Sequence, residues 1–326
     1  MLRSAHLALA ILGTFAAGAY AQSSVAVSEA LGVDVAAVFT LESGVLTDTG
    51  RSDQNGVLFG RQAYVGLDGR LGMLTLGRLY NPQYLVLIDV ADPFKGGGGM
   101  AGSASNLAGY TVKRYDNTIK YVTPKLGGLS ASAIYSFGEM AFSSASNRAY
   151  GATLGYADGP VTLSISHQRK RNFLQASGTV PAVDNSARNS LVAANFNFGI
   201  GTAYAGYGHN KGEGSSPWDP SNPYGAMVLS TPSTDSRDVL MGVSVPFGAS
   251  TFMASYIRKD DRNLANRDAR QIAIGMAYAL SKHTDFYVSY ARIKNMNGAA
   301  YTYTVGNATQ SGRGDSAFNI GLWHSF

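Results

Sequence analysis

The chain has no cysteine, few prolines and no long apolar segment beyond its first 21 residues. Of its 326 residues, none is Cys and 10 are Pro. Secreted proteins of this length often use disulfides, and the absence of cysteine excludes a disulfide-stapled scaffold. After residue 22 no apolar run approaches the roughly 20 residues that a membrane-spanning helix needs. The sequence therefore predicts neither a disulfide-rich domain nor a helical membrane protein.

The first 21 residues have the parts of a secretory signal peptide. Arg3 precedes an uncharged stretch over residues 7–18, and Ala19-Tyr20-Ala21 forms an A-x-A cleavage site. We expect cleavage before Gln22, with residues 1–21 as the signal peptide and residues 22–326 as one large domain. Loss of Arg3 takes the formal net charge from +5 to +4, so this domain is mildly basic.

Short segments with alternating polarity fill the rest of the chain. In the last ten residues, AFNIGLWHSF, one face carries Phe318, Ile320 and Leu322 together with the terminal Phe326. Such a strand has period 2, and its apolar face can meet lipid. The mean hydropathy is −0.04, as expected when outward apolar and inward polar side chains balance. This pattern is typical of an outer-membrane β-barrel, and Phe326 is the expected assembly signal.

Turns of two sizes separate these segments. Tight turns, most of them with Gly, join the expected strand pairs 58–67 with 73–80, 117–123 with 129–137, 150–156 with 161–167, 191–198 with 202–208, 237–245 with 251–258, and 270–280 with 285–293. Long polar or Gly-rich stretches lie between the pairs, at 81–116, 168–189, 209–236, 259–268 and 294–314. Tight periplasmic turns that alternate with long external loops are the pattern of a bacterial barrel. The prediction is an all-β fold, an antiparallel transmembrane β-barrel.

The facing of single strands indicates a channel. Residues 272, 274, 276, 278 and 280 are all large and apolar or aromatic, whereas Gln271, Ala273, Gly275 and Ala277 alternate with them. We expect the first set to face lipid and the second to face the interior. An interior of small and polar side chains is wet rather than packed.

Several motifs resemble the general trimeric porins of Gram-negative β-proteobacteria. The motifs are LFGRQAYVGL at 58–67, LTLGRLYNPQY at 74–84, DNTIKYVTPKLGG at 116–128, YALSKHTDFYVSYARI at 278–293 and the last strand with its terminal Phe. The resemblance covers the chain from about Ser28 to Phe326. It implies a 16-stranded barrel, a homotrimer in the outer membrane, and passive diffusion of small hydrophilic solutes and ions. It also implies contact with outer-membrane lipid and lipopolysaccharide, and neither enzyme activity nor a cofactor.

In that family the third external loop folds into the lumen, where its acidic residues face basic residues of the wall. The matching segment here is 81–114, and its charged side chains are Asp89, Asp92, Lys95, Lys113 and Arg114. The wall candidates are Arg78, Lys120 and Arg61, with Arg114 at the end of the loop.

Strand alternation favours Lys120 as a lumen residue, because Ile119 and Tyr121 would face lipid. Arg78 shares parity with Leu74 and Leu76, so a lumen position requires a bulge or a strand end. The simpler interpretation of each arginine is a solvated rim residue. Few loop acids facing several wall bases would make the lumen positive, so we expect a modest anion preference.

The sequence departs from the family at its N-terminus. Residues 23–32 run directly into 33–43, which resembles the family's second strand, so its first strand and first external loop are missing. About 15 strands can be counted, or 14 if one is lost. An odd number forces the first and last strands to pair in parallel. The alternatives are an unconventional closure, a 14-stranded barrel, or a truncated product that assembles poorly.

Other functions have weaker support. The histidines are scattered and form no H-x-x-H spacing, no G-x-S-x-G motif occurs, and no Gly-Lys-Ser/Thr follows the glycines at 96–99. Three basic residues at 169–171 are usually a solvated face, so no nucleic-acid partner is expected. Two alternatives stay open: an adhesin or structural barrel with outward loops, and a specific channel for anionic solutes. An inward-folded 81–114 segment would favour a pore over an adhesin.

Overall fold

The structure is a computed structural model of the chain. It describes residues 6–9, 20–46, 49–95, 108–109, 112–138, 146–174, 176, 179, 183–216, 233–299, 301 and 316–325. Phe326 and the glycines at 96–99 lie outside the described residues. Among those that are described, no helix is long and apolar enough to cross a membrane.

Seventeen strands make up most of the described structure. They are β1 His6–Leu9, β2 Tyr20–Gly32, β3 Val35–Leu46, β4 Arg51–Ser52, β5 Gln62–Gly69, β6 Gly72–Tyr80, β7 Arg114–Val122, β8 Leu129–Ser136, β9 Ala149–Asp158, β10 Val161–Leu174, β11 Val183–Asn197, β12 Thr202–Lys211, β13 Asp235–Phe247, β14 Ser250–Asp261, β15 Ala269–Ala279, β16 Thr284–Asn295 and β17 Ser316–Ser325. Three short helical segments join them: α1 Asp53–Gly56, α2 Pro82–Val86 and the π-helix η1 Leu87–Ala91.

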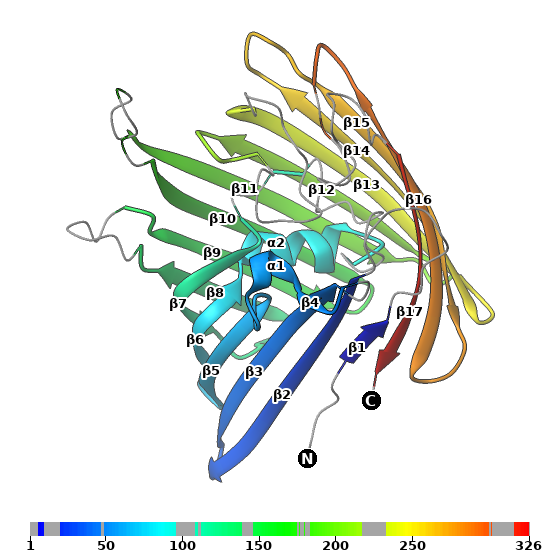
Figure 1. The fold of residues 1–326 in the computed structure, drawn as a ribbon. Helices are drawn as coiled ribbons and strands as arrows, with labels where there is room; N and C mark the ends of the chain where they lie inside the picture. Colours follow the sequence, from blue (N-terminus) through cyan, green and yellow to red (C-terminus); the bar gives the residue numbers. More distant parts are fainter. Residues whose placement is uncertain are drawn as a thin grey trace.

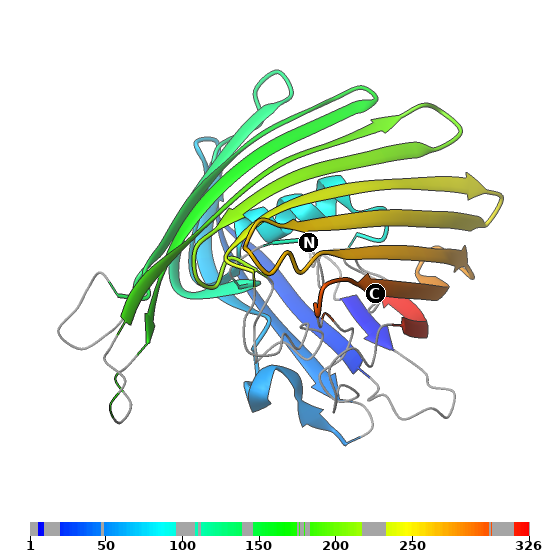
Figure 2. The ribbon, with the colours of Figure 1, turned by 90° about the horizontal axis from the view of Figure 1, so that it is seen from above.

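The strands form one antiparallel sheet that curves into a barrel (Figures 1 and 2). Each long strand pairs with its neighbours in sequence, and β3 pairs with β5 across the two-residue β4. Without β4, the 17-stranded sheet has the 16 strands that the resemblance implies. The predicted antiparallel β-barrel is therefore confirmed.

The barrel is closed through β1, which has four residues. β1 pairs antiparallel with β17, from His6 opposite Ser325 to Leu9 opposite Leu322, and with β2, at Leu7 opposite Ser23. Figure 1 shows β1 between β2 and β17. Setting β1 and β4 aside leaves 15 long strands, which equals the number counted in the sequence. The sixteenth strand comes from residues that the sequence assigns to the signal peptide. Cleavage before Gln22 stays a prediction.

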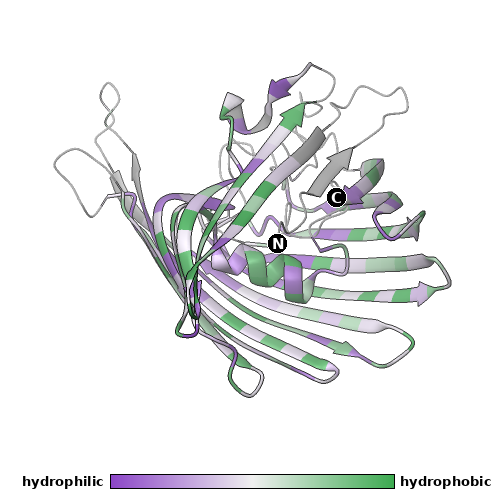
Figure 3. Cartoon of the chain, turned by 90° about the horizontal axis from the view of Figure 1, so that it is seen from below, coloured by the Kyte–Doolittle hydropathy of each residue, from purple (hydrophilic) through white to green (hydrophobic). Residues whose placement is uncertain are grey.

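Alternate side chains face opposite sides of the wall, as the sequence indicates. Ile272 and Ile274 on β15 are 60% and 56% exposed, whereas Gln271 and Ala273 between them are almost fully buried. Figure 3 shows the resulting alternation of hydrophobic and hydrophilic bands along the strands. Because a barrel in lipid needs an apolar outer surface, the exposed apolar side chains mark the lipid-facing side.

Several strands are longer on the loop side than the sequence pattern predicts. The predicted loop at 168–189 is wrong over most of its length, because β10 continues to Leu174 and β11 begins at Val183. In the same way β12 extends to Lys211 and β14 to Asp261. Polar side chains end the apolar pattern but do not interrupt the backbone hydrogen bonds, so the ladder continues above the apolar band.

Candidate pore constriction

A helical segment lies inside the barrel. We call residues 81–95 the inserted segment; it follows β6 directly and contains α2 and η1 (Figures 1 and 2). Asn81 begins the helix, since its Oδ1 accepts hydrogen bonds from the backbone N–H groups of Gln83 at 2.8 Å and Tyr84 at 3.3 Å. Pro82 at the first helical position needs no hydrogen-bond acceptor. The Asn-Pro pair thus turns the chain from the wall into the lumen.

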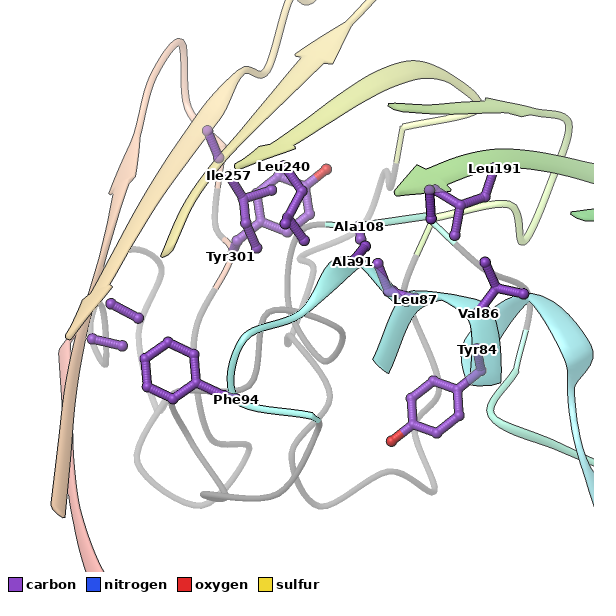
Figure 4. Packing of buried hydrophobic residues seen from close by; sticks show 14 of the residues in the cluster. Tyr84, Val86, Leu87, Ala91, Phe94, Ala108, Leu191, Leu240, Ile257 and Tyr301 are labelled. Atoms are coloured by element: carbon purple, nitrogen blue, oxygen red, sulfur yellow. The ribbon is translucent and has the colours of Figure 1, made fainter. Parts of the chain in front are cut away.

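One side of the inserted segment packs against the wall. Val86, Leu87 and Ala91 are almost fully buried, and they belong to one cluster with Leu191 of β11 and Leu240 of β13. Figure 4 shows these side chains between the helix and the strands. The predicted wet interior is therefore wrong where the inserted segment packs against the wall. Apolar burial against the wall supplies the free energy that holds the segment there.

Glycines in the wall make room for this contact. A Cβ atom built on Gly242 would lie 2.7 Å from the ring of Pro93, and one on Gly275 would lie 2.8 Å from the ring of Phe94. On Gly206 it would lie 3.2 Å from Cβ of Ala91. The small side chains that indicated an open channel therefore form the surface on which the inserted segment lies.

A buried polar network holds Gly109, near the other end of the segment at 81–114. The Asp238 carboxylate accepts hydrogen bonds from Nζ of Lys259 at 2.9 Å, Nδ2 of Asn210 at 2.7 Å and the backbone N–H of Gly109 at 2.5 Å. Lys259 also donates to Oγ of Ser236 at 3.1 Å. Sequence analysis missed both charged residues. They lie directly opposite each other on β13 and β14, so the two-residue turn at 248–249 could have identified the pair.

Within α2 and η1, Asp89 is the one residue that is exposed. Partial burial raises the pKa of its carboxyl group, and the charges of Lys95 and Lys120 oppose that shift. Lys120 lies on β7, opposite Thr75 and Ile134, which are both buried on the inner face. The structure thus brings together three of the predicted constriction residues: Asp89 and Lys95 of the inserted segment and Lys120 of the wall.

Three other predicted basic residues contact groups at the root of the loop. Nε of Arg61 lies 2.6 Å from Oε1 of Glu42. The Arg114 guanidinium lies 4.7 Å from the centroid of the Tyr80 ring, and the ammonium of Lys113 lies 5.5 Å from that of Tyr84. The Lys113 contact joins the inserted segment to the start of β7, the Arg114 contact joins β7 to the end of β6, and the Arg61 ion pair joins the start of β5 to β3.

Arg78 has its hydrogen-bond and ion-pair partners outside the inserted segment. Its guanidinium forms an ion pair with Asp116, and its Nε donates to the carbonyl oxygen of Gly60 at 2.7 Å. The register between β6 and β7 shifts between Gly77 and Leu79, so a bulge is present at this residue. Asp92 is fully buried and its Oδ1 accepts a hydrogen bond from the backbone of Phe94 at 3.0 Å, which stabilises the end of the segment.

The described residues contain no group of three or more His, Cys, Asp or Glu side chains that could hold a metal ion. Inside the barrel the inserted segment packs against the wall and carries Asp89 and Lys95 as exposed charged residues. Such an arrangement can select solutes by size and charge.

Known proteins are similar to this chain in sequence. The Gram-negative porin family matches residues 27–298. An outer membrane porin protein of Bordetella pertussis is 31% identical over 294 residues, covering 81% of this chain and 75% of that protein. Outer membrane porin protein 32 of Delftia acidovorans is 25% identical over 313 residues, covering 92% and 82%.

A solved structure has the same fold. The anion-selective porin from Comamonas acidovorans has a TM-score of 0.69 at 22% identity and covers 99% of this chain and 97% of its own. Porins are passive channels rather than enzymes, and they lie in the outer membrane. The barrel wall, the segment inserted into its lumen and the matched sequence agree: this chain belongs to the Gram-negative porin family.

Proposed function

We propose that this porin is a general diffusion channel for small hydrophilic solutes with a modest preference for anions. The observation that carries the proposal is the position of Asp89, an exposed acid of the inserted segment, in the field of both Lys95 and Lys120. Two bases around one acid give this part of the pore a net positive charge. In a narrow pore with low-dielectric walls, a net positive charge raises the local concentration of anions.

Two further observations support this proposal. The solved porin of the same fold from Comamonas acidovorans is named as anion-selective. The second observation is that the segment at 81–95 folds inward onto the wall, as a constricting loop does, which favours a pore over an adhesin with outward loops. A homotrimer, and export by a signal peptide cleaved before Gln22, complete the proposal. Such cleavage removes β1, so the mature barrel would close between β2 and β17.

Planar bilayer recordings on the refolded protein test this function. Under a KCl gradient we expect discrete conductance steps, usually in threes, and a reversal potential on the anion side. A reversal potential on the cation side would contradict the anion preference. A folded, heat-modifiable barrel that gives no conductance would contradict the pore itself and favour the adhesin.

A channel specific for anionic solutes is a second candidate. A polar cavity of about 420 Å³ lies beside the root of the inserted segment, and its lining includes Arg78, Lys113, Arg114 and Lys170 with one carboxylate, Asp116. Its positive charge would suit a carboxylate or phosphate group. A specific channel would show block of the chloride current by millimolar succinate or phosphate, whereas a general porin would conduct these ions without saturation.

A further inference from the structure

An aromatic pair lies on the last two long strands, near the end of the barrel where the tight turns are. Figure 1 shows β16 and β17 side by side. The rings of Tyr287 on β16 and Trp323 on β17 meet edge to face, with their centroids 6.4 Å apart and an interplanar angle of 76°. Trp323 is 42% exposed. The pair is therefore a partly open aromatic surface and not part of a packed core.

The facing of Trp323 excludes the usual role of an aromatic residue at the end of a barrel strand. Aromatic girdles of outer-membrane barrels face lipid. Phe318 on the same strand does so and is 65% exposed. Trp323 has the opposite parity: it shares its face of β17 with Gly321 and with Ala317, which belongs to the cluster under the inserted segment. Trp323 thus faces the lumen.

The ring of Tyr287 is held in place by its neighbours on β17. Gly321 lies directly opposite Tyr287, and a Cβ atom on this glycine would overlap the ring, with Cε1 at 2.8 Å. The side-chain amide of Asn319 and the hydroxyl of Tyr287 are hydrogen-bonded. A glycine under the ring and a bond to its hydroxyl fix the orientation of the aromatic pair before any ligand arrives.

A carboxylate lies beside the two rings. Asp285 is directly opposite Trp323 in the strand register and shares its face of β16 with Tyr287. Its side chain is partly exposed, and within the described part of the chain it has no ion-pair partner. His324 has the opposite parity, and its Nδ1 lies 2.9 Å from Oγ1 of Thr284. The inner face thus combines a negative charge with two aromatic rings at this point.

We propose that Asp285, Tyr287 and Trp323 bind the quaternary ammonium group of a small organic cation inside the lumen. Aromatic faces attract such a group through their quadrupole, and the carboxylate supplies the opposite charge. The methyl groups of a quaternary ammonium can contact the rings directly, whereas a primary ammonium is strongly hydrated.

This site is separate from the other features of the pore. It uses none of the residues that carry the proposed anion preference, so the two proposals can fail independently. All three residues lie on β16 and β17, and cleavage before Gln22 removes none of them.

Tryptophan fluorescence of the full chain tests the proposal. The sequence contains two tryptophans, so Trp218→Phe leaves Trp323 as the single reporter. This parent variant is refolded in an uncharged detergent and titrated, at constant ionic strength, with choline or with 3,3-dimethylbutan-1-ol, which has the same shape without the charge. We expect a saturating change in emission, with choline binding roughly fivefold or more tightly than the neutral compound.

Variants in the same background separate the charge from the rings. Asp285→Asn and Tyr287→Leu should each weaken choline binding, whereas Tyr287→Phe keeps the ring and should retain it. The matched control is Asp68→Asn, which removes an exposed acid from the tight-turn end of β5. It should bind choline as the parent does, and heat-modifiability shows that each barrel has formed.

Three results would overturn the proposal: equal affinity for choline and the neutral compound, unchanged binding in Asp285→Asn, or a change in emission that does not saturate. A barrel that binds choline but gives no conductance in a bilayer would contradict the pore and leave this site standing.

Discussion

Nζ of Lys259 lies 2.9 Å from Oδ1 of Asp238, and both side chains are buried between the wall and the loop that enters the lumen. Asp238 also binds the backbone of Gly109, so the pair connects two neighbouring wall strands with a third segment 129 residues away in sequence. The contact is formed in the interior, where water does not screen it.

Replacing Asp238 by Asn should loosen the loop. The variant removes the carboxylate that contacts the buried ammonium of Lys259, and breaking a buried ion pair costs about 3–5 kcal/mol in soluble proteins. We expect noisier single-channel currents and closure at a lower voltage, while heat-modifiability shows that the barrel still forms. Asp260→Asn, which removes an acid from the outer face of β14, is the control. Currents of D238N as quiet as those of the wild type would show that the apolar contacts alone hold the loop.

Replacing Lys120 by Gln should reduce the anion preference. At an intermediate effective dielectric constant, one unit charge within about 10 Å of the ion path changes the free energy of an ion by about 1 kcal/mol, or roughly fivefold in the ion's local concentration. The reversal potential under a KCl gradient should therefore move toward the cation side. Lys282→Gln, in a tight turn, should leave it unchanged. If the two variants behave alike, Lys120 does not face the ion path.

Acidification should increase the anion preference through Asp89. Burial raises the pKa of this carboxyl group, and below that pKa the group is neutral, which leaves Lys95 and Lys120 unopposed. The reversal potential should shift to the anion side as pH falls through the raised pKa of this carboxyl group. In Asp89→Asn this component of the pH dependence should be absent. A variant that titrates as the wild type does would assign the effect to another group.

Adding a side chain to the wall under the inserted segment should displace it. In Gly242→Ala the new methyl group would lie 2.7 Å from Pro93, and overpacking of this kind typically costs about 1–3 kcal/mol. We expect a lower unfolding temperature and an altered conductance. Gly32→Ala adds a methyl group with no heavy atom within 4 Å and should change neither property. Unchanged conductance in G242A would mean that the segment does not rest on this glycine.

Removing residues 1–21 should expose the closing strands. In a chain that begins at Gln22, β17 loses the neighbour that pairs with Leu322, and β2 loses the one that pairs with Ser23. We expect faster amide hydrogen exchange in β17 of the shortened chain than in β17 of residues 1–326, measured by mass spectrometry after refolding both. Exchange in β13 and β14 should be equal in the two chains. Equal protection of β17 would indicate that β2 and β17 pair directly, in parallel.

Local pattern was enough to identify the barrel, because alternation of apolar and polar residues reports which side of a strand meets lipid. The facing of Ile272 and Gln271 and the number of long strands could be read in this way. The ends of the strands could not be read in this way, since the hydrogen-bond ladder of β10 continues past His167, where the predicted strand ends, through Arg169 to Leu174.

The alternation of residues along β7 was enough to predict that Lys120 lies on the inner face. The position of Arg78 could not be predicted from alternation, because it depends on the register shift between β6 and β7.

The sequence by itself determined the class of wall and the charges that the segment at 81–114 carries, whereas the entry of this segment into the lumen was implied by the family resemblance alone. Only the tertiary structure decided that the glycines of β12 to β15 carry the inserted segment rather than line open water. It also decided that Asp238 binds the backbone of Gly109, and that residues 6–9 complete the ring. Each of these depends on contacts between residues far apart in the chain. Such contacts follow from how the whole sheet curves and closes, which no local pattern encodes.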